Sequence, residues 1–319
     1  MATLVVGASI AAYHHRELAA QRGSTALLSQ LTWFDRGGKE LGTVGPLANH
    51  GNVELSPDGR QAAVTVLNTS VGTRDIWLYN VAGSQRTRFT TSDADENWAI
   101  WSRDGSRIIF NSTRNGPARL DLFESPAMAG SAPNMLLEDG MWPLSWAPDG
   151  RHILFVVNGP RTGNDVMVLP LFGDRKPFAF AQSEEAENWA TFSPDGRWVA
   201  FSSTETGGAE VWVASFPPTP AGMAAKRRVS SDGGSQARWS RDGKEIFFVA
   251  RDRSLMVAAV DGAGATLQVG SRRKLFEPRF YFLDSHGFDV TADGQRFLVN
   301  TLVVSPATPA RIAAVEAGA

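Results

Sequence analysis

The chain of 319 residues has no cysteine, no excess of basic charge and no long apolar run, and each shortage excludes a class of protein. Without cysteine there is no disulfide, no thiolate metal site and no cysteine nucleophile. The net charge is −2 with both signs interspersed, so we expect no basic face and no nucleic-acid partner. The G-x-S-x-G, H-E-x-x-H and Walker motifs are also missing, which removes three common hydrolytic and phosphate-binding sites.

Residues 1 to 13 are apolar, but this run is too short to cross a bilayer and lacks the basic leader of a secretory signal. It is a frayed terminal helix in one interpretation and the end of a longer transmembrane helix in the other. We therefore predict a helical or flexible segment over residues 1–30, with no membrane span within this chain.

What the sequence does contain is one tetrapeptide repeated six times, ending in Asp-Gly and preceded by an aromatic or aliphatic residue. The steps between successive turn aspartates are 46, 45, 46, 47 and 51 residues, each about the length of a four-stranded propeller blade. The turn aspartates are Asp58, Asp104, Asp149, Asp195, Asp242 and Asp293.

Asp-Gly between two apolar strands is a hairpin turn, because glycine accepts a positive φ and the aspartate side chain accepts from nearby backbone amides. We therefore assign all six aspartates a structural role. Six hairpins predict an all-β, six-bladed β-propeller over residues 31–319. The last blade has its first two strands at about residues 287–301 and one further candidate strand at 310–315, so it is incomplete. Residues 31–45 form a hairpin without a blade of its own. We expect this N-terminal hairpin to close the ring, since an open ring leaves two unpaired sheet edges.

With its S-P-D-G turns and its D-I-W-L-Y strand at residues 75–79, the chain resembles the TolB-like propeller repeat. It is most similar to the propeller sensor domains that follow a transmembrane helix in bacterial serine/threonine kinases, through L-T-W-F-D-R at 31–36 and D-G-Q-R-F-L-V-N at 293–300. The resemblance implies a binding or sensing role and an extracytoplasmic, periplasmic location. It supplies no catalytic residues.

The polar residues four to eleven positions before each turn aspartate are expected to ring one mouth of the axial channel, because the innermost strands begin there. Two blades share the sequence E-N-W-A in this region, at residues 96–99 and 187–190. In one interpretation the tryptophans pack between blades while the glutamates are solvated. In the other the region binds a ligand, through Glu96, Trp98, Glu187 and Trp189.

Oxygen ligands converging from several blades suit Ca²⁺, which takes roughly six to eight of them. In residue type the ring is similar to that of calcium-dependent lactonase propellers of the gluconolactonase and paraoxonase kind. The matching ligands are Glu54, Asn97, Asn188 and Asp289. His50 and His286 are candidate bases, because ring closure makes their blades neighbours; the alternative is two entrance-loop histidines with no shared task.

Two functions follow from these patterns. The first is a sensor-type module that binds a small molecule, peptide or protein at the channel mouth. The second is a metal-dependent lactonase, a Ca²⁺-dependent hydrolase of acyl-homoserine lactones or similar lactones, in which the metal polarises the carbonyl and a base activates water.

Overall fold

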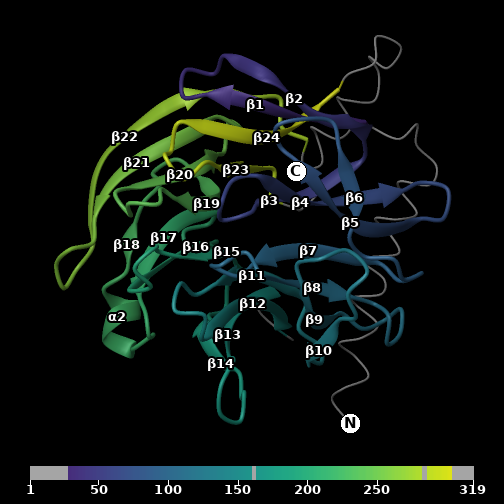
Figure 1. The fold of residues 1–319 in the computed structure, drawn as a ribbon. Coiled ribbons are helices and arrows are strands. Elements are labelled where there is room, and N and C mark those ends of the chain that lie inside the picture. Colours follow the sequence, from purple (N-terminus) through teal and green to yellow (C-terminus); the bar gives the residue numbers. More distant parts are fainter. Residues whose placement is uncertain (1–27, 160–162, 282–285, 304–319) are drawn as a thin grey trace.

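Six four-stranded antiparallel sheets surround a central axis in the computed structural model, which describes residues 28–159, 163–281 and 286–303 (Figure 1). The predicted six-bladed propeller is therefore confirmed. No helix in these ranges is long and apolar enough to span a membrane. Residues 1–27 and a strand predicted at 310–315 lie outside the described residues.

We number the blades after the six turn aspartates and list their strands from the axis outward. Blade 1 consists of β3 (His50–Leu55), β4 (Gln61–Asn68), β5 (Thr73–Asn80) and β6 (Arg86–Arg88). Blade 2 consists of β7 (Glu96–Trp101), β8 (Arg107–Ser112), β9 (Asp121–Pro126) and β10 (Asn134–Leu137). Blade 3 consists of β11 (Trp142–Trp146), β12 (His152–Gly159), β13 (Gly163–Pro170) and β14 (Phe178–Ala181). Blade 4 consists of β15 (Glu187–Phe192), β16 (Trp198–Ser203), β17 (Glu210–Ser215) and β18 (Arg227–Arg228). Blade 5 consists of β19 (Gly234–Trp239), β20 (Glu245–Ala250), β21 (Leu255–Asp261) and β22 (Gln268–Phe276). Blade 6 consists of β23 (Phe288–Val290), β24 (Arg296–Leu302), β1 (Ser29–Asp35) and β2 (Glu40–Ala48). A short helix, α2 (Pro220–Ala224), precedes β18.

Ring closure follows the predicted route. β1 pairs with β24 from Ser29 opposite Leu302 to Asp35 opposite Arg296, and β2 adds the outer edge. The N-terminal and C-terminal parts of the propeller thus share one blade, which removes the two free edges that an open ring would have.

The turn aspartates hold the hairpins, as predicted. In blade 1, Asp58 Oδ1 accepts hydrogen bonds from the amide of Arg60 at 3.0 Å and from Ser56 Oγ at 2.6 Å. Each of the other five turn aspartates accepts from the amide two residues later in the same way. The following glycines have φ between +67° and +73°, which other residues rarely adopt. These six carboxylates are therefore committed to the turns.

Several tryptophans at the ends of the inner strands join neighbouring blades. Trp101 Nε1 donates to the carbonyl of Glu54 and Trp239 Nε1 to that of Thr191, each at 3.2 Å. The equivalent Trp146 Nε1 is buried and has no hydrogen-bond partner among the described residues. These indoles pack between neighbouring blades.

Candidate functional site

The inner strands are bulged, and the bulges determine which side chains face the axis. The residue six positions before the turn aspartate has a positive φ in three blades: +55° at Trp98, +56° at Trp189 and +55° at Gln236. The pairing register shifts at the same places. A bulge re-aims the side chains around it, and the axial side chains form two separate levels.

The first level is an aromatic cluster near the start of the inner strands. The ring centroid of Trp98 lies 5.6 Å from that of Trp142, 5.3 Å from that of Trp189 and 5.5 Å from that of His286. His286 also packs against Trp189, with ring centroids 4.9 Å apart and the rings tilted by 44°. We call these four residues the aromatic level. Trp98 is 4% exposed and His286 2% exposed, so the aromatic level fills this part of the axis.

Burial and the nearby Arg238 hold the pKa of His286 well below its usual value of 6.5, so this ring is neutral at pH 7. Both of its ring nitrogens are buried without a hydrogen-bond partner in the described part of the chain.

The second level is a charged triad four residues before the turns, formed by Glu54, Arg238 and Asp289. Arg238 Nη2 donates to Glu54 Oε2 at 2.6 Å, and its Nε lies 3.8 Å from Asp289 Oδ1. Asp289 also accepts from the amides of Leu55 at 2.7 Å and Val290 at 2.8 Å. We call these three residues the charged level.

Burial raises the pKa of Glu54 to about 7, because desolvation outweighs the attraction of Arg238, and the charge of Asp289 acts in the same direction as burial. The Glu54 carboxyl therefore changes its charge near neutral pH.

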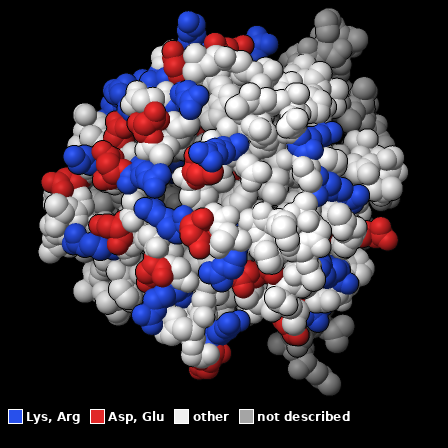
Figure 2. Space-filling model, in the orientation of Figure 1, with Lys and Arg blue, Asp and Glu red and all other residues white. Residues whose placement is uncertain are grey.

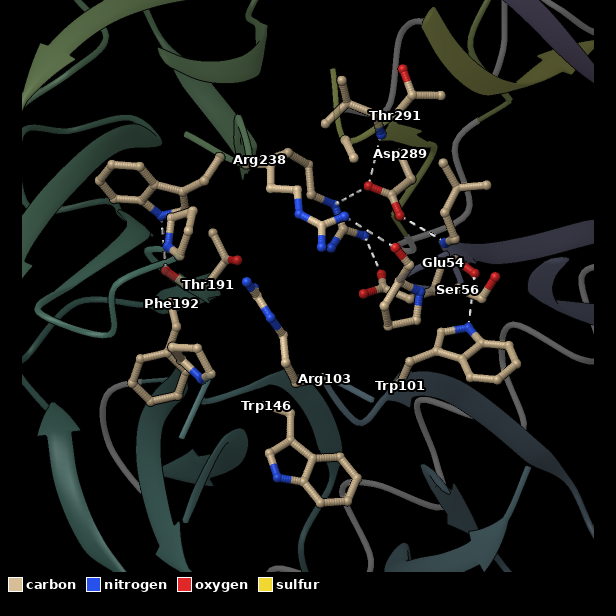
Figure 3. A pocket seen from close by; sticks show the side chains of 18 of the residues that line it. Glu54, Ser56, Trp101, Arg103, Trp146, Thr191, Phe192, Arg238, Asp289 and Thr291 are labelled. Atoms are coloured by element: carbon tan, nitrogen blue, oxygen red, sulfur yellow. Dashed lines mark hydrogen bonds and ion pairs between the residues drawn. The ribbon is translucent and has the colours of Figure 1, made fainter. Parts of the chain in front are cut away.

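The charged level forms the floor of a pocket of about 240 Å³ that opens on the face carrying the Asp-Gly turns. Residues of all six blades line this turn-face pocket, among them Trp101, Thr191 and, on its rim, Arg103 and Arg241. Figure 3 shows Arg103 pointing into the pocket, with Arg238 lying between Asp289 and Glu54. Over the face seen in Figure 2, Lys and Arg side chains are interspersed with Asp and Glu.

The predicted ligand-binding residues divide into two kinds. Trp98 and Trp189 meet at the aromatic level, whereas Glu96 and Glu187 bind the loops that precede their own strands. Glu96 Oε1 accepts from Ser92 Oγ at 2.8 Å and pairs with Arg114, and Glu187 accepts from the hydroxyl and amide of Ser183. Both glutamates thus fix the conformation of the loops before their strands.

The two candidate bases have different surroundings. His50 is fully buried, with Nδ1 3.1 Å from Ser29 Oγ and Nε2 3.1 Å from Tyr79 Oη, so it links the closing blade to blade 1. Burial lowers its pKa to about 4. His286 lies among tryptophans instead, and no hydrogen bond or ring contact joins the two imidazoles within the described residues. Their catalytic role stays a prediction.

The four candidate calcium ligands lie at different levels. Glu54 and Asp289 belong to the charged level. Asn97 and Asn188 lie three residues earlier in their repeats, roughly 10 Å away along a strand. Asn97 Oδ1 accepts from Thr65 Oγ1 at 2.6 Å, and Asn188 Oδ1 accepts from the amide of Trp189 at 2.8 Å. In the described ranges no three His, Cys, Asp or Glu side chains form a group that could hold a metal. Calcium binding therefore stays a prediction, in which the ion would displace Arg238 from Glu54 and Asp289.

Sequence reasoning missed the arginines of the turn-face pocket. Arg238 occupies the same repeat position as Glu54 and Asp289, and Arg103 and Arg241 replace the proline of the S-P-D-G turn. Aligning the six repeats would have revealed both positions. At each of them some repeats carry a charged residue and the others a neutral one.

The fold and site define a closed six-bladed propeller whose axis is blocked by aromatic residues at one level and opens to a charged pocket at the other. No family model matches the chain. It is 30% identical over 113 residues to dipeptidyl-peptidase 5 of Porphyromonas gingivalis, a match that covers 34% of this chain and spans 16% of the length of that peptidase.

Solved structures share the fold. The putative TolB of Agrobacterium tumefaciens superposes with a TM-score of 0.66 at 17% identity, over 88% of this chain and 100% of that chain. The TolB of Acinetobacter baumannii gives 0.55 at 16% identity, over 79% and 63%. Oligogalacturonate lyase in complex with manganese gives 0.53 at 14% identity, over 84% and 76%. This chain thus has the six-bladed β-propeller fold of the TolB proteins, and its link to kinases stays a prediction.

Proposed function

We propose that this propeller is a non-catalytic, sensor-type binding module whose ligand, a small molecule or a short part of a peptide or protein, enters the turn-face pocket. The observation that supports the proposal is the convergence of all six blades on this one pocket. A concave site built from several elements, with a few polar groups among aromatic side chains, is typical of ligand recognition.

The chemistry of the pocket favours binding over turnover. The two carboxylates at its floor already have partners in the protein: Glu54 pairs with Arg238, and Asp289 accepts hydrogen bonds from two backbone amides. A general base needs a free lone pair within reach of a water or substrate proton. The lactonase alternative therefore gains no specific support from this geometry.

The proposal is tested by blocking the pocket. A panel of small acids, amides and sugars is screened by ligand-observed NMR against the wild-type protein and against Thr191→Trp, which fills the pocket. Because Thr191 is largely buried, Pro57→Trp at the rim serves as a second blocking variant. Thr206→Trp, in an exposed loop outside this pocket, is the matched control.

We expect ligands of the wild type to lose binding to both blocking variants and to keep it with the control. Ligands that bind all four proteins equally would contradict the proposed location. A parallel assay with a lactone panel, with and without chelator, checks the alternative: chelator-sensitive hydrolysis would replace the binding proposal with the enzyme.

A further inference from the structure

The repeat itself points to a pair of opposed arginines. The residue before the turn aspartate is proline or alanine in four blades and arginine in two, Arg103 in blade 2 and Arg241 in blade 5. In a ring of six, blades 2 and 5 stand opposite each other (Figure 1). The two long cationic side chains therefore start from opposite sides of the same mouth.

Both arginines are exposed, and no carboxylate lies within ion-pair distance of either in the described part of the chain. Arg241 Nη1 reaches the carbonyl of Pro57 in blade 1 at a long 3.4 Å, so it already extends over the mouth. Arg103 points into the pocket in Figure 3. Their guanidinium groups are thus available to a ligand.

The charge of the turn-face pocket is unbalanced by one unit. Three arginines and two carboxylates line it, which gives +1 when Glu54 and Asp289 are ionised. A neighbouring groove of about 430 Å³ shares Arg103 and Arg241, but there they and one lysine face three aspartates and the sum is zero. The excess positive charge therefore belongs to the axial pocket, and it matches a ligand group with one negative charge.

We infer that the turn-face pocket is a carboxylate-recognition site, in which Arg103 and Arg241 hold one carboxylate between them above Arg238. This inference rests on the proposed function and deepens it. Guanidinium forks match the planar carboxylate and donate two parallel hydrogen bonds to it. A phosphate dianion fits less well, because its second charge would face Glu54 and Asp289 at the floor.

The test uses isothermal titration calorimetry with two matched pairs of probes. N-acetylglycine and its neutral amide represent a free small acid. The peptides acetyl-Gly-Asp-Gly-amide and acetyl-Gly-Asn-Gly-amide represent an acidic side chain of a protein. The proteins are the wild type, Arg103→Gln, Arg241→Gln and the double variant. Arg60→Gln is the control, because Arg60 follows the blade 1 turn, is 86% exposed at its side chain and lies outside the pocket.

We expect binding of at least one acid and of neither amide, with affinity reduced roughly 10-fold or more by each single substitution and unchanged by Arg60→Gln. Tighter binding by N-acetylglycine identifies a small acid as the source of the carboxylate, and tighter binding by the aspartate peptide identifies a protein segment. Equal binding of acid and amide, no binding of either acid, or full affinity in the double variant would overturn the inference. The blocking variants Thr191→Trp and Pro57→Trp test the pocket itself, so each idea can fail without the other.

Discussion

The substitution Glu54→Gln tests the electrostatics of the charged level. Glu54 has a pKa of about 7 in the folded protein and an ordinary value of 4.5. The folded state therefore holds the proton more firmly than the unfolded chain. A raised pKa contributes stability that is complete below pH 4.5 and is lost as the pH rises through 7.

The size of the effect follows from these two pKa values. Between pH 5 and pH 8 the Glu54 carboxyl should cost the wild type about 2 to 3 kcal/mol of unfolding free energy. Glutamine keeps an oxygen that accepts from Arg238 but does not titrate. Two buried histidines titrate in the opposite direction, so the difference between the wild type and Glu54→Gln is the informative quantity.

The assay is urea denaturation at four pH values between 5 and 8. We expect the free energy of unfolding of Glu54→Gln, relative to the wild type, to rise by about 2 to 3 kcal/mol across this range. The control Glu138→Gln, at an exposed loop position, should stay within about 0.5 kcal/mol at every pH. A difference between Glu54→Gln and the wild type that does not vary with pH would refute our account of Glu54.

Three further predictions concern other parts of the molecule. Trp101→Phe should reduce the free energy of unfolding by about 1 kcal/mol more than Trp146→Phe, because Trp101 Nε1 donates to a carbonyl of the neighbouring blade whereas Trp146 Nε1 has no hydrogen-bond partner among the described residues; equal losses in urea denaturation would contradict this. His50 has a pKa of about 4 against an ordinary 6.5, so its contribution to stability is complete above pH 6.5 and falls by about 2 to 3 kcal/mol on going from pH 7 to pH 4. His50→Gln should remove that part of the pH dependence in calorimetry, and an unchanged profile would show that His50 does not titrate as described. The calcium hypothesis predicts a rise in melting temperature with Ca²⁺ that Glu54→Gln and Asn188→Ala reduce; stabilisation unaffected by both changes would exclude these ligands.

The fold was predictable because each blade repeats one local signal. Asp-Gly with apolar flanks predicts a hairpin without knowledge of distant residues, and six copies predict the blade number. Closure was predictable for a different reason: residues 31–45 formed a hairpin with no blade, and blade 6 lacked two strands. The observed strands, Ser29–Asp35 and Glu40–Ala48, extend this hairpin by a few residues.

The site was only partly predictable, because it depends on how bulged strands turn their side chains. Trp98 and Trp189 share a repeat position, but their contact across the axis at the aromatic level is seen only in the folded ring. Asn97 and Glu54 were grouped in one ring, although a spacing of three residues separates them along the axis. The position of His50 depends on a hydrogen bond to Ser29 in another blade, and no local pattern indicates such a contact.

The central claim is that ligands bind at the charged level and not at the aromatic level, and the indole N–H signals of tryptophan in ¹⁵N NMR test it directly. Trp101, Trp146 and Trp239 line the turn-face pocket, whereas Trp98, Trp142 and Trp189 belong to the aromatic level. Titration with a ligand should shift the first three signals and leave the last three in place. Shifts confined to Trp98, Trp142 and Trp189 would contradict the claim.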